Sequence, residues 1–419
     1  MELESLLISQ NPWWNRDFNI NQLPEYKLSR RFSFDDFSKY LNETSLMIFL
    51  KGMRRMGKST LMKQMVIDLI EKQKVNPNDI YFIEFSQTFN DLPKVFQRIK
   101  SGSFVFLDEI QYCENWRNSL KEYYDLAKAK RIIFSGSATL GFTKEKESLL
   151  GRFIPIQLNP LTFREYLYLK YGKDFNKAYR NSIEWQTYIF YGEFPELLKM
   201  ESNGLKYIYL RNSVIEPLVT MDISFYNVEK KTEFLNFLKT LAANVAQVIN
   251  KSNISAEVGI SRPSVDRYLA ILQDIGVVKL VPNYYKSARQ VISSDKKVFF
   301  SSANLALALL SIKSLEGPET AQFSGHIFEN AVYNQISPYF EEIFYWKRKQ
   351  KEMDFIVKDS NFLKCLEVKH KNNINNAEYL FYKRSSENIG AKSFNIVYNG
   401  ESNLKEGLVN PVNIDEVLV

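Results

Sequence analysis

The residue types and spacing best suited to chemistry lie in one stretch, Gly52-Met53-Arg54-Arg55-Met56-Gly57-Lys58-Ser59-Thr60. Two glycines five positions apart allow backbone N–H groups to wrap around an anion. Lys58 can then reach the terminal phosphates of a nucleotide, and the Ser59 hydroxyl can hold Mg²⁺. The stretch therefore predicts a loop that binds ATP and Mg²⁺, and all of its residues are expected to line the nucleotide.

Two carboxylates close an apolar segment further along the chain, Phe104-Val105-Phe106-Leu107-Asp108-Glu109. In phosphoryl-transfer sites, a first carboxylate supports Mg²⁺ and a second polarises the attacking water. We therefore expect Asp108 to contribute to cofactor binding and Glu109 to catalysis. This interpretation requires that the segment be a strand in the same sheet as the loop.

Two further residues are candidates for the same site. Ser137 ends the sequence Ser135-Gly136-Ser137 and offers a hydroxyl to the γ-phosphate or the water, although serine and glycine are also ordinary turn residues. Arg152 offers positive charge to a γ-phosphate in its own subunit or in a neighbouring one. The alternative for Arg152 is a surface salt bridge.

A third group of charged residues lies near the C-terminal end of the chain: Glu329, Asp354, Glu367 and Lys369. Glu367 and Lys369 are two apart on an expected strand, so they project from one face. The group predicts a Mg²⁺ site made by Glu329, Asp354 and Glu367, with Glu367 and Lys369 as catalytic groups of a nuclease. From the spacing alone, a solvated face is favoured over this site, because charges often alternate on half-exposed strands.

The elements around the first loop alternate between strand and helix. Apolar strands are expected at 46–50, 79–85, 104–109 and 131–135, and a helix is expected directly after the loop. This alternation predicts a parallel sheet covered on both faces, with its ligand beyond the carboxyl ends of the strands. The loop, Asp108 and Glu109 should then meet at one edge.

A helix-turn-helix pattern follows residue 229. Ser261 is an expected N-cap, Gly276 ends the second helix, and an apolar strand follows. The pattern predicts a winged helix-turn-helix. Arg262 and Arg267 on its recognition helix are candidate DNA contacts, whereas Asp266 on the same helix weakens the attraction to phosphate.

Composition restricts the class of protein. The chain has 419 residues, of which 45% are hydrophobic, so it can form several domains with sizeable cores. A formal net charge of +7 permits a nucleic-acid partner without requiring one. Two cysteines and two histidines are too few for a disulfide framework or a zinc cluster. Without a secretory signal or a membrane-length apolar run, a cytoplasmic protein is expected.

These motifs resemble, in order, the prokaryotic AAA-type ATPases that carry a C-terminal DUF4143 domain. The resemblance covers nearly the whole chain and includes the loop at 52–60, Asn11-Pro12-Trp13-Trp14, Leu107-Asp108-Glu109-Ile110-Gln111, Leu150-Gly151-Arg152, Gly192-Glu193-Phe194-Pro195-Glu196 and Glu367-Val368-Lys369. It implies an ATPase core and a restriction-endonuclease-like core. Two departures occur: Gly192-Glu193 replaces the more usual Gly-Gly, and Ser59 stands where threonine is frequent.

An α/β multidomain architecture is therefore expected. Its parts are an N-terminal strap at 1–30, a P-loop core with a parallel sheet at 31–160, a helical lid at 161–228, a winged helix-turn-helix at 229–300 and a restriction-endonuclease-like domain at 301–419. The expected function is an ATP-hydrolysing switch whose nuclease-like domain acts on DNA. The alternative is a regulatory protein whose nuclease-like fold is inactive and binds protein partners. Either could form a homo-oligomer.

Overall fold

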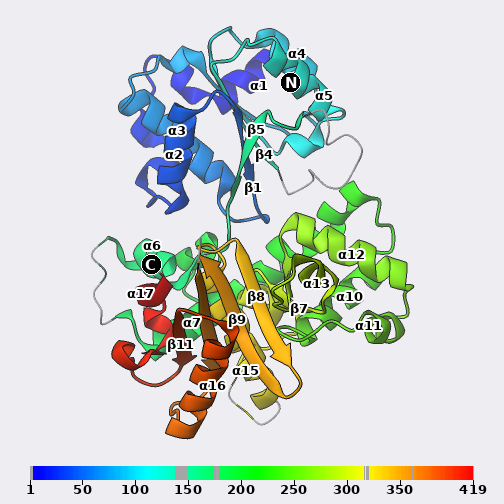
Figure 1. Cartoon of the computed structure of the whole chain (residues 1–419). Helices are drawn as coiled ribbons and strands as arrows, with labels where there is room; N and C mark the ends of the chain where they lie inside the picture. Colours follow the sequence, from blue (N-terminus) through cyan, green and yellow to red (C-terminus); the bar gives the residue numbers. More distant parts are fainter. Residues whose placement is uncertain are drawn as a thin grey trace. The chain divides into compact units, whose positions relative to one another are not determined.

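Five parallel strands form a sheet in the order β2-β3-β4-β1-β5 (Figure 1). The strands are β1 (Met47–Lys51), β2 (Ile80–Glu84), β3 (Phe104–Asp108), β4 (Arg131–Gly136) and β5 (Phe153–Gln157). The residues of β1 to β4 are almost all buried, as expected for a parallel sheet covered on both faces. The predicted α/β class with a parallel sheet around the loop is confirmed. Strand β5 was not predicted, because it lies at the edge and contains Pro155.

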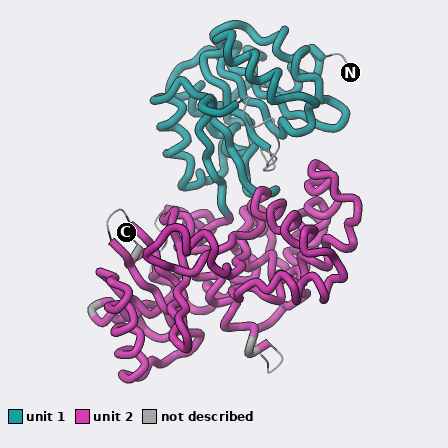
Figure 2. The backbone as a smooth tube through the Cα atoms, turned by 45° about the vertical axis from the view of Figure 1, so that its right-hand side comes forward, with its two compact units in different colours: residues 1–159 teal, residues 160–419 magenta. Residues whose placement is uncertain are grey.

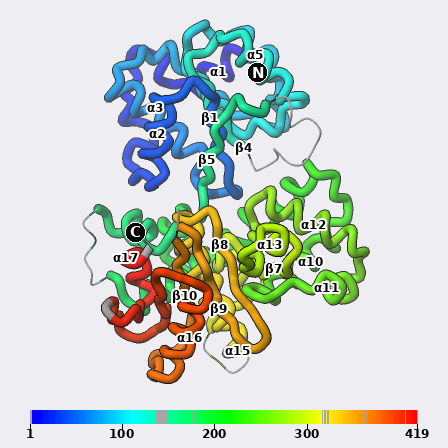
Figure 3. Tube along the Cα trace, viewed as in Figure 1, coloured from blue at the N-terminus to red at the C-terminus, as the bar shows by residue number. Residues whose placement is uncertain are grey.

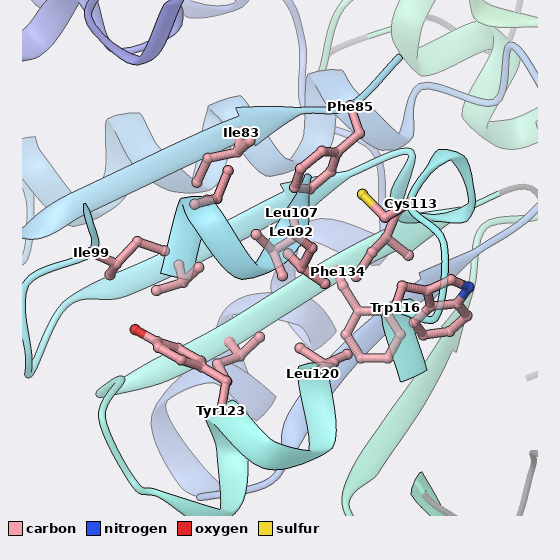
Figure 4. Close-up of a cluster of buried hydrophobic side chains, with 14 of the residues drawn as sticks. Ile83, Phe85, Leu92, Ile99, Leu107, Cys113, Trp116, Leu120, Tyr123 and Phe134 are labelled. Carbon is pink, nitrogen blue, oxygen red and sulfur yellow. The ribbon is translucent and has the colours of Figure 1, made fainter. Parts of the chain in front are cut away.

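Helices cover both faces of this sheet. On one face lie α1 (Leu3–Gln10), α4 (Leu92–Arg98) and α5 (Trp116–Asp125), and on the other lie α2 (Ser33–Glu43) and α3 (Lys58–Glu71). Figure 4 shows the core under the first group, where Phe134 of β4 and Leu107 of β3 pack with Trp116 and Leu120 of α5. Successive strand residues point to opposite faces, so β1 contributes Phe49 to this core and Ile48 to the other.

The chain divides into two compact units, Met1–Asn159 and Pro160–Val419 (Figure 2). The structure describes residues 3–136, 149–173, 175, 179–315, 317, 320–359 and 362–418. Within those residues, no helix is long and apolar enough to cross a membrane. The parallel sheet belongs to the first unit, and the segments expected as lid, helix-turn-helix and nuclease-like domain all belong to the second.

The exposed edge of the first sheet is closed by side chains from the N-terminal strap. Asn11 is fully buried, and its amide donates to Phe82 O at 2.9 Å and accepts from Phe82 N at 2.6 Å. Trp13 and Trp14 both donate their indole N–H to Ile80 O, at 3.2 and 2.9 Å. These bonds satisfy backbone groups of β2 that no neighbouring strand reaches. The aromatic strap is thus structural.

Helices make up the first half of the second unit. They are α6 (Phe163–Tyr171), α7 (Ser182–Tyr191), α8 (Asn203–Tyr209), α9 (Glu216–Thr220), α10 (Lys231–Ala243), α11 (Lys251–Val258) and α12 (Arg262–Ile275). A two-stranded antiparallel sheet follows, formed by β6 (Val278–Pro282) and β7 (Lys296–Phe300) with α13 (Ala288–Ser293) between them (Figure 3). Ser261 caps α12 by accepting from Ser264 N at 3.2 Å, and Gly276 ends the helix with φ +82°, as predicted.

A second, mixed sheet has the order β12-β11-β10-β9-β8. Its strands are β8 (Glu342–Arg348), β9 (Lys351–Asp359), β10 (Phe362–Lys369), β11 (Ser393–Tyr398) and β12 (Leu408–Val409). Pairing is antiparallel from β8 to β10 and parallel from β10 to β12. Three helices complete this region: α14 (Ala303–Leu309), α15 (Ala321–Ile336) and α16 (Asn376–Ile389), while α17 (Asp415–Leu418) closes the chain.

A buried carboxylate joins the helical half of the second unit to its later elements. Glu193, just after α7, accepts from Ser302 Oγ at 2.6 Å, from Asn304 N at 2.9 Å and from Asn334 Nδ2 at 2.9 Å. Burial raises the pKa of Glu193 to about 7, although these donors oppose the shift. The glutamate that replaces the more usual glycine therefore connects α7 with α14 and α15.

We expect Asn11→Ala to lower the free energy of unfolding by about 2–4 kcal/mol, because it leaves two buried backbone groups of Phe82 without partners. Gln10→Ala is the matched control. Gln10 makes the same pair of bonds to Glu84, at 3.0 and 3.1 Å, but at an exposed position where water can replace it. Urea unfolding of both variants measures the difference, and equal losses would contradict the argument.

Candidate functional site

The nine-residue loop runs from the end of β1 to the start of α3, as predicted. At Gly52, φ is +156° and a Cβ would lie 2.4 Å from Leu158 O, so a side chain is excluded there. Gly57 directly precedes the first turn of α3. Its φ of +87° is a left-handed conformation, which glycine adopts without strain. The N-terminus of α3 therefore opens directly onto the loop and can stabilise an anion held there.

The Lys58 side chain lies inside the loop. It is 4% exposed, and its Nζ donates to Gly52 O at 3.0 Å and to Met53 O at 3.1 Å. Arg31 supports the loop from outside by donating to Met56 O at 3.0 Å and to Asn159 O at 2.8 Å. The lysine that is expected to hold the phosphates is thus fixed by the loop's own carbonyl groups, which a phosphate oxygen would have to replace.

Asp108 and Glu109 lie at the carboxyl end of β3, as expected. Asp108 is fully buried, and the Ser135 hydroxyl of β4 donates to its Oδ1. The same hydroxyl accepts from Glu109 N at 3.2 Å. Glu109 has φ +55°, which is uncommon for a residue with a side chain, and Gln111 Nε2 donates to its carboxylate. Ser135 and Gln111 therefore position the two carboxylates, although neither was predicted to do so.

The surroundings of Asp108 fit a divalent cation. Its Oδ2 is buried and has no hydrogen-bond partner, while the Ser59 hydroxyl interacts with the same carboxylate. Burial and the nearby Glu109 charge raise the pKa of Asp108 to about 6, and the hydroxyls of Ser135 and Ser59 oppose this rise. A cation between Ser59 and Asp108 would receive the oxygen ligands that Mg²⁺ prefers and would offset the buried charge.

Ser137 and Arg152 were also expected at this site. Ser137 lies outside the described residues. Arg152 lies just before β5, whose first residue pairs with Met47 at the amino end of β1, whereas the loop follows the carboxyl end of β1. In its own chain Arg152 therefore lies toward the end of β1 opposite to the loop, and of the two interpretations left open for its action on a phosphate, a neighbouring subunit stays a prediction. Its guanidinium instead pairs with Asp125, with Nε 2.9 Å from Oδ1.

The two arginines predicted to contact DNA have different surroundings on α12. Arg262 begins the helix and is exposed. Arg267 donates to Tyr226 O at 2.7 Å and to Asn227 O at 3.0 Å, so it stabilises a neighbouring turn. Asp266 pairs with Lys251 of α11 at 2.5 Å. Arg262 is therefore the better placed of the two predicted contacts.

The C-terminal carboxylates are brought close together, but each is bound within the protein. Asp354 Oδ2 accepts from Val368 N at 2.8 Å, and Glu367 Oε2 accepts from Asp354 N at 3.3 Å. Lys369 Nζ lies 2.5 Å from Glu367 Oε1. Burial and the charge of Asp354 raise the pKa of Glu367 well above its usual value. The predicted ligands thus contact one another's backbone and a lysine.

A second lysine, which sequence reasoning missed, binds the remaining carboxylates. Lys297 Nζ of β7 lies 2.9 Å from Glu329 Oε1, 2.8 Å from Glu352 Oε1 and 3.8 Å from Asp354 Oδ1. Among the described residues, no three His, Cys, Asp or Glu side chains form a group that could hold a metal ion. The predicted metal site of Glu329, Asp354 and Glu367 is therefore not assembled as a ligand set. Lys297 follows Asp295 and Lys296 in the sequence, so no local pattern distinguishes it from a solvated charge.

Three consecutive segments of the chain match known families. The AAA domain family matches residues 44–167, which include the nucleotide loop. A domain of unknown function, DUF8612, matches residues 182–316, and another, DUF4143, matches residues 324–416. The matched segments follow the order that the sequence motifs indicated.

Two relatives align with most of the chain. An uncharacterized protein of Methanocaldococcus jannaschii is 26% identical over 384 residues, which cover 84% of this chain and 81% of the relative. An uncharacterized protein of Haemophilus influenzae is 24% identical over 347 residues, which cover 78% of this chain and 83% of the relative. The similarity therefore extends well beyond the nucleotide loop.

Solved structures with some similarity include the Walker-type ATPase of Pyrococcus abyssi, with 15% identity and a TM-score of 0.38 over 70% of this chain and 100% of that one. The ORC1 protein of Aeropyrum pernix, solved in complex with DNA, has 13% identity and a TM-score of 0.32 over 72% of this chain and 97% of that one. Both TM-scores are below 0.5, so the assignment of the AAA-type fold rests on the family matches and on the strand order. The chain therefore combines a segment that matches the AAA domain family with a C-terminal segment that matches DUF4143.

Proposed function

We propose that the N-terminal unit binds ATP with Mg²⁺ and hydrolyses it. The observation that carries this proposal is the buried, unpartnered Oδ2 of Asp108, whose carboxylate lies near the Ser59 hydroxyl at the edge where the loop lies. A structural aspartate would be expected to have both oxygens satisfied. The site instead keeps one anionic oxygen available beside a loop shaped for phosphate.

Each residue then has a distinct task. The loop N–H groups and the N-terminus of α3 bind the phosphates, and Lys58 transfers its hydrogen bonds from Gly52 O and Met53 O to phosphate oxygens. Mg²⁺, held by Ser59 and Asp108, would neutralise charge on the phosphates when bound. Glu109 orients the attacking water and accepts its proton, and Gln111 keeps the Glu109 carboxylate in place.

The second unit is proposed to receive this nucleotide signal and to contact DNA. The helix pair α11–α12 followed by the antiparallel strands β6 and β7 has the element order of a winged helix-turn-helix. Arg262 is exposed at the start of α12, the end of a recognition helix that reads base edges or phosphates. The ion pair between Asp266 and Lys251 removes part of the unfavourable acidic charge on the same helix.

For the C-terminal sheet, we propose the interaction role in place of nucleic-acid cleavage. A metal-dependent nuclease needs carboxylates that are free to bind the ion. Here Glu367 is paired with Lys369, and Glu329 is paired with Lys297. The sheet is therefore proposed to act as a binding platform whose buried charges are neutralised internally. Degradation of labelled DNA with Mg²⁺ that is lost in an Asp354→Ala, Glu367→Ala double variant would overturn this part.

Lys58→Ala should abolish ATP binding, because it removes the counter-charge inside the loop, whereas Glu109→Gln should keep binding and lower kcat by roughly 100-fold or more. Fluorescent-nucleotide titration and phosphate release separate the two effects. Gln111→Ala serves as a comparison that should lower kcat less, since it only positions Glu109. A normal hydrolysis rate in Glu109→Gln would contradict the assigned role.

Arg152→Ala should lower turnover without weakening ATP binding, if Arg152 acts on the nucleotide of a neighbouring subunit. Asp125→Ala is the control, because it breaks the same ion pair but keeps the arginine. Mixing Arg152→Ala with Lys58→Ala should restore activity, since one variant supplies the arginine and the other the intact loop. Equal effects of the two ion-pair variants on stability, with no change in turnover, would make Arg152 purely structural.

Duplex DNA should raise the ATPase rate of the wild type, and Arg262→Ala should reduce both the stimulation and the DNA affinity, with a smaller salt dependence. Lys128→Ala removes an equal charge from an exposed position in the first unit and should leave DNA binding unchanged. Fluorescence anisotropy at two salt concentrations and phosphate release measure these effects. Unchanged ATPase and no DNA binding at low salt would leave the protein-interaction role.

A further inference from the structure

Lys297 is an unusual residue for its position. It is the second residue of β7, preceded by Lys296 and followed by an apolar run; it is 4% exposed, and its Nζ approaches three carboxylates. The ring of Tyr345 lies 5.5 Å from the same Nζ. An ammonium group taken out of water must be compensated by close anions, and this group is surrounded by them. Lys297 thus fills the centre of a carboxylate cluster formed by Glu329, Glu352 and Asp354.

The carboxylates of this cluster come from elements that converge on one point. Glu329 is on α15, whereas Glu352 and Asp354 are on β9, two residues apart. Burial together with the charge of Asp354 raises the pKa of Glu329 to about 8, while Lys297 lowers it. Without Lys297, these groups would repel one another in a buried site, so the cluster requires a cation at its centre.

We propose that Lys297 is a built-in cation that takes the place of a divalent metal, so that Glu329, Glu352 and Asp354 form a latent metal site closed by β7. The ammonium lies 2.8–2.9 Å from two of the carboxylates, the spacing of charge-assisted hydrogen bonds. Removing the lysine side chain opens space for an oxygen-liganded ion among the same acidic groups. This inference does not depend on ATP hydrolysis and goes beyond the proposed function.

The backbone around Lys297 keeps the site closed. Lys297 pairs with Val281 of β6, and Val248 forms a bridge with it on the other side. The next residues, Val298, Phe299 and Phe300, are fully buried. Withdrawing β7 would expose this apolar run and leave three acidic groups without a cation, so both consequences oppose opening. The wild-type cluster is therefore expected to exclude Mg²⁺ and Mn²⁺.

The test counts Mn²⁺ bound to the nucleotide-free, full-length protein by electron paramagnetic resonance. Lys297→Ala should bind about one more Mn²⁺ per chain than the wild type. Adding Glu329→Gln and Asp354→Asn to Lys297→Ala should remove that ion. Lys347→Ala is the matched control, because Lys347 contacts Glu352 at 2.8 Å but is exposed and lies outside the cluster, so it should gain no ion.

Two results would overturn the inference. The first is a folded Lys297→Ala protein that binds no additional Mn²⁺. The second is Mn²⁺ bound by the wild type and lost in a Glu329→Gln, Asp354→Asn variant, which would show that the lysine does not exclude the metal. This second comparison decides the question even if Lys297→Ala fails to fold, and equal Mn²⁺ binding by those two proteins supports closure by Lys297.

Discussion

The parallel alignment of β1, β3 and β4 is the constraint on which the nucleotide site depends. Parallel strands bring their carboxyl ends to the same edge, so the loop after β1 and the carboxylates that end β3 must meet there. The register between β1 and β4 places Leu50 beside Ser135, and the Ser135 hydroxyl donates to Asp108. The same alignment sends Arg152 to the opposite edge, because it precedes a parallel strand. Strand direction therefore decides which charged residues can share one site.

Buried carboxylates have different partners in the two units. In the first unit, Asp108 keeps one oxygen without a partner beside the phosphate loop. In the second, Lys297 and Lys369 neutralise the acidic groups directly, and Glu193 is satisfied by three hydrogen-bond donors. A buried oxygen without a hydrogen-bond partner is unfavourable unless a ligand binds it, whereas an ion pair with full hydrogen bonding needs no ligand. This contrast is why a ligand is assigned to the first site and none to the second.

The edge strand β2 of the first sheet also depends on residues that are distant in the sequence. Strand β2 ends the sheet and would expose its backbone groups, yet Asn11 and the two tryptophans of the strap bind them. These contacts join residues separated by about seventy positions, so the strap can make them only on the folded sheet. The N-terminal segment is thus part of the nucleotide-binding unit, and loss of the strap would weaken the sheet that aligns the site.

The sequence by itself determined the phosphate loop, the strands that follow it and the roles open to Asp108 and Glu109, because glycine spacing and apolar runs are local signals. It also indicated the cap at Ser261 and the helix end at Gly276. Only the tertiary structure decided the partners of Arg152 and Arg267. It also decided that the Lys297 ammonium lies among carboxylates from α15 and β9. Those contacts join residues far apart in the chain, and no local pattern specifies which charges a fold brings together.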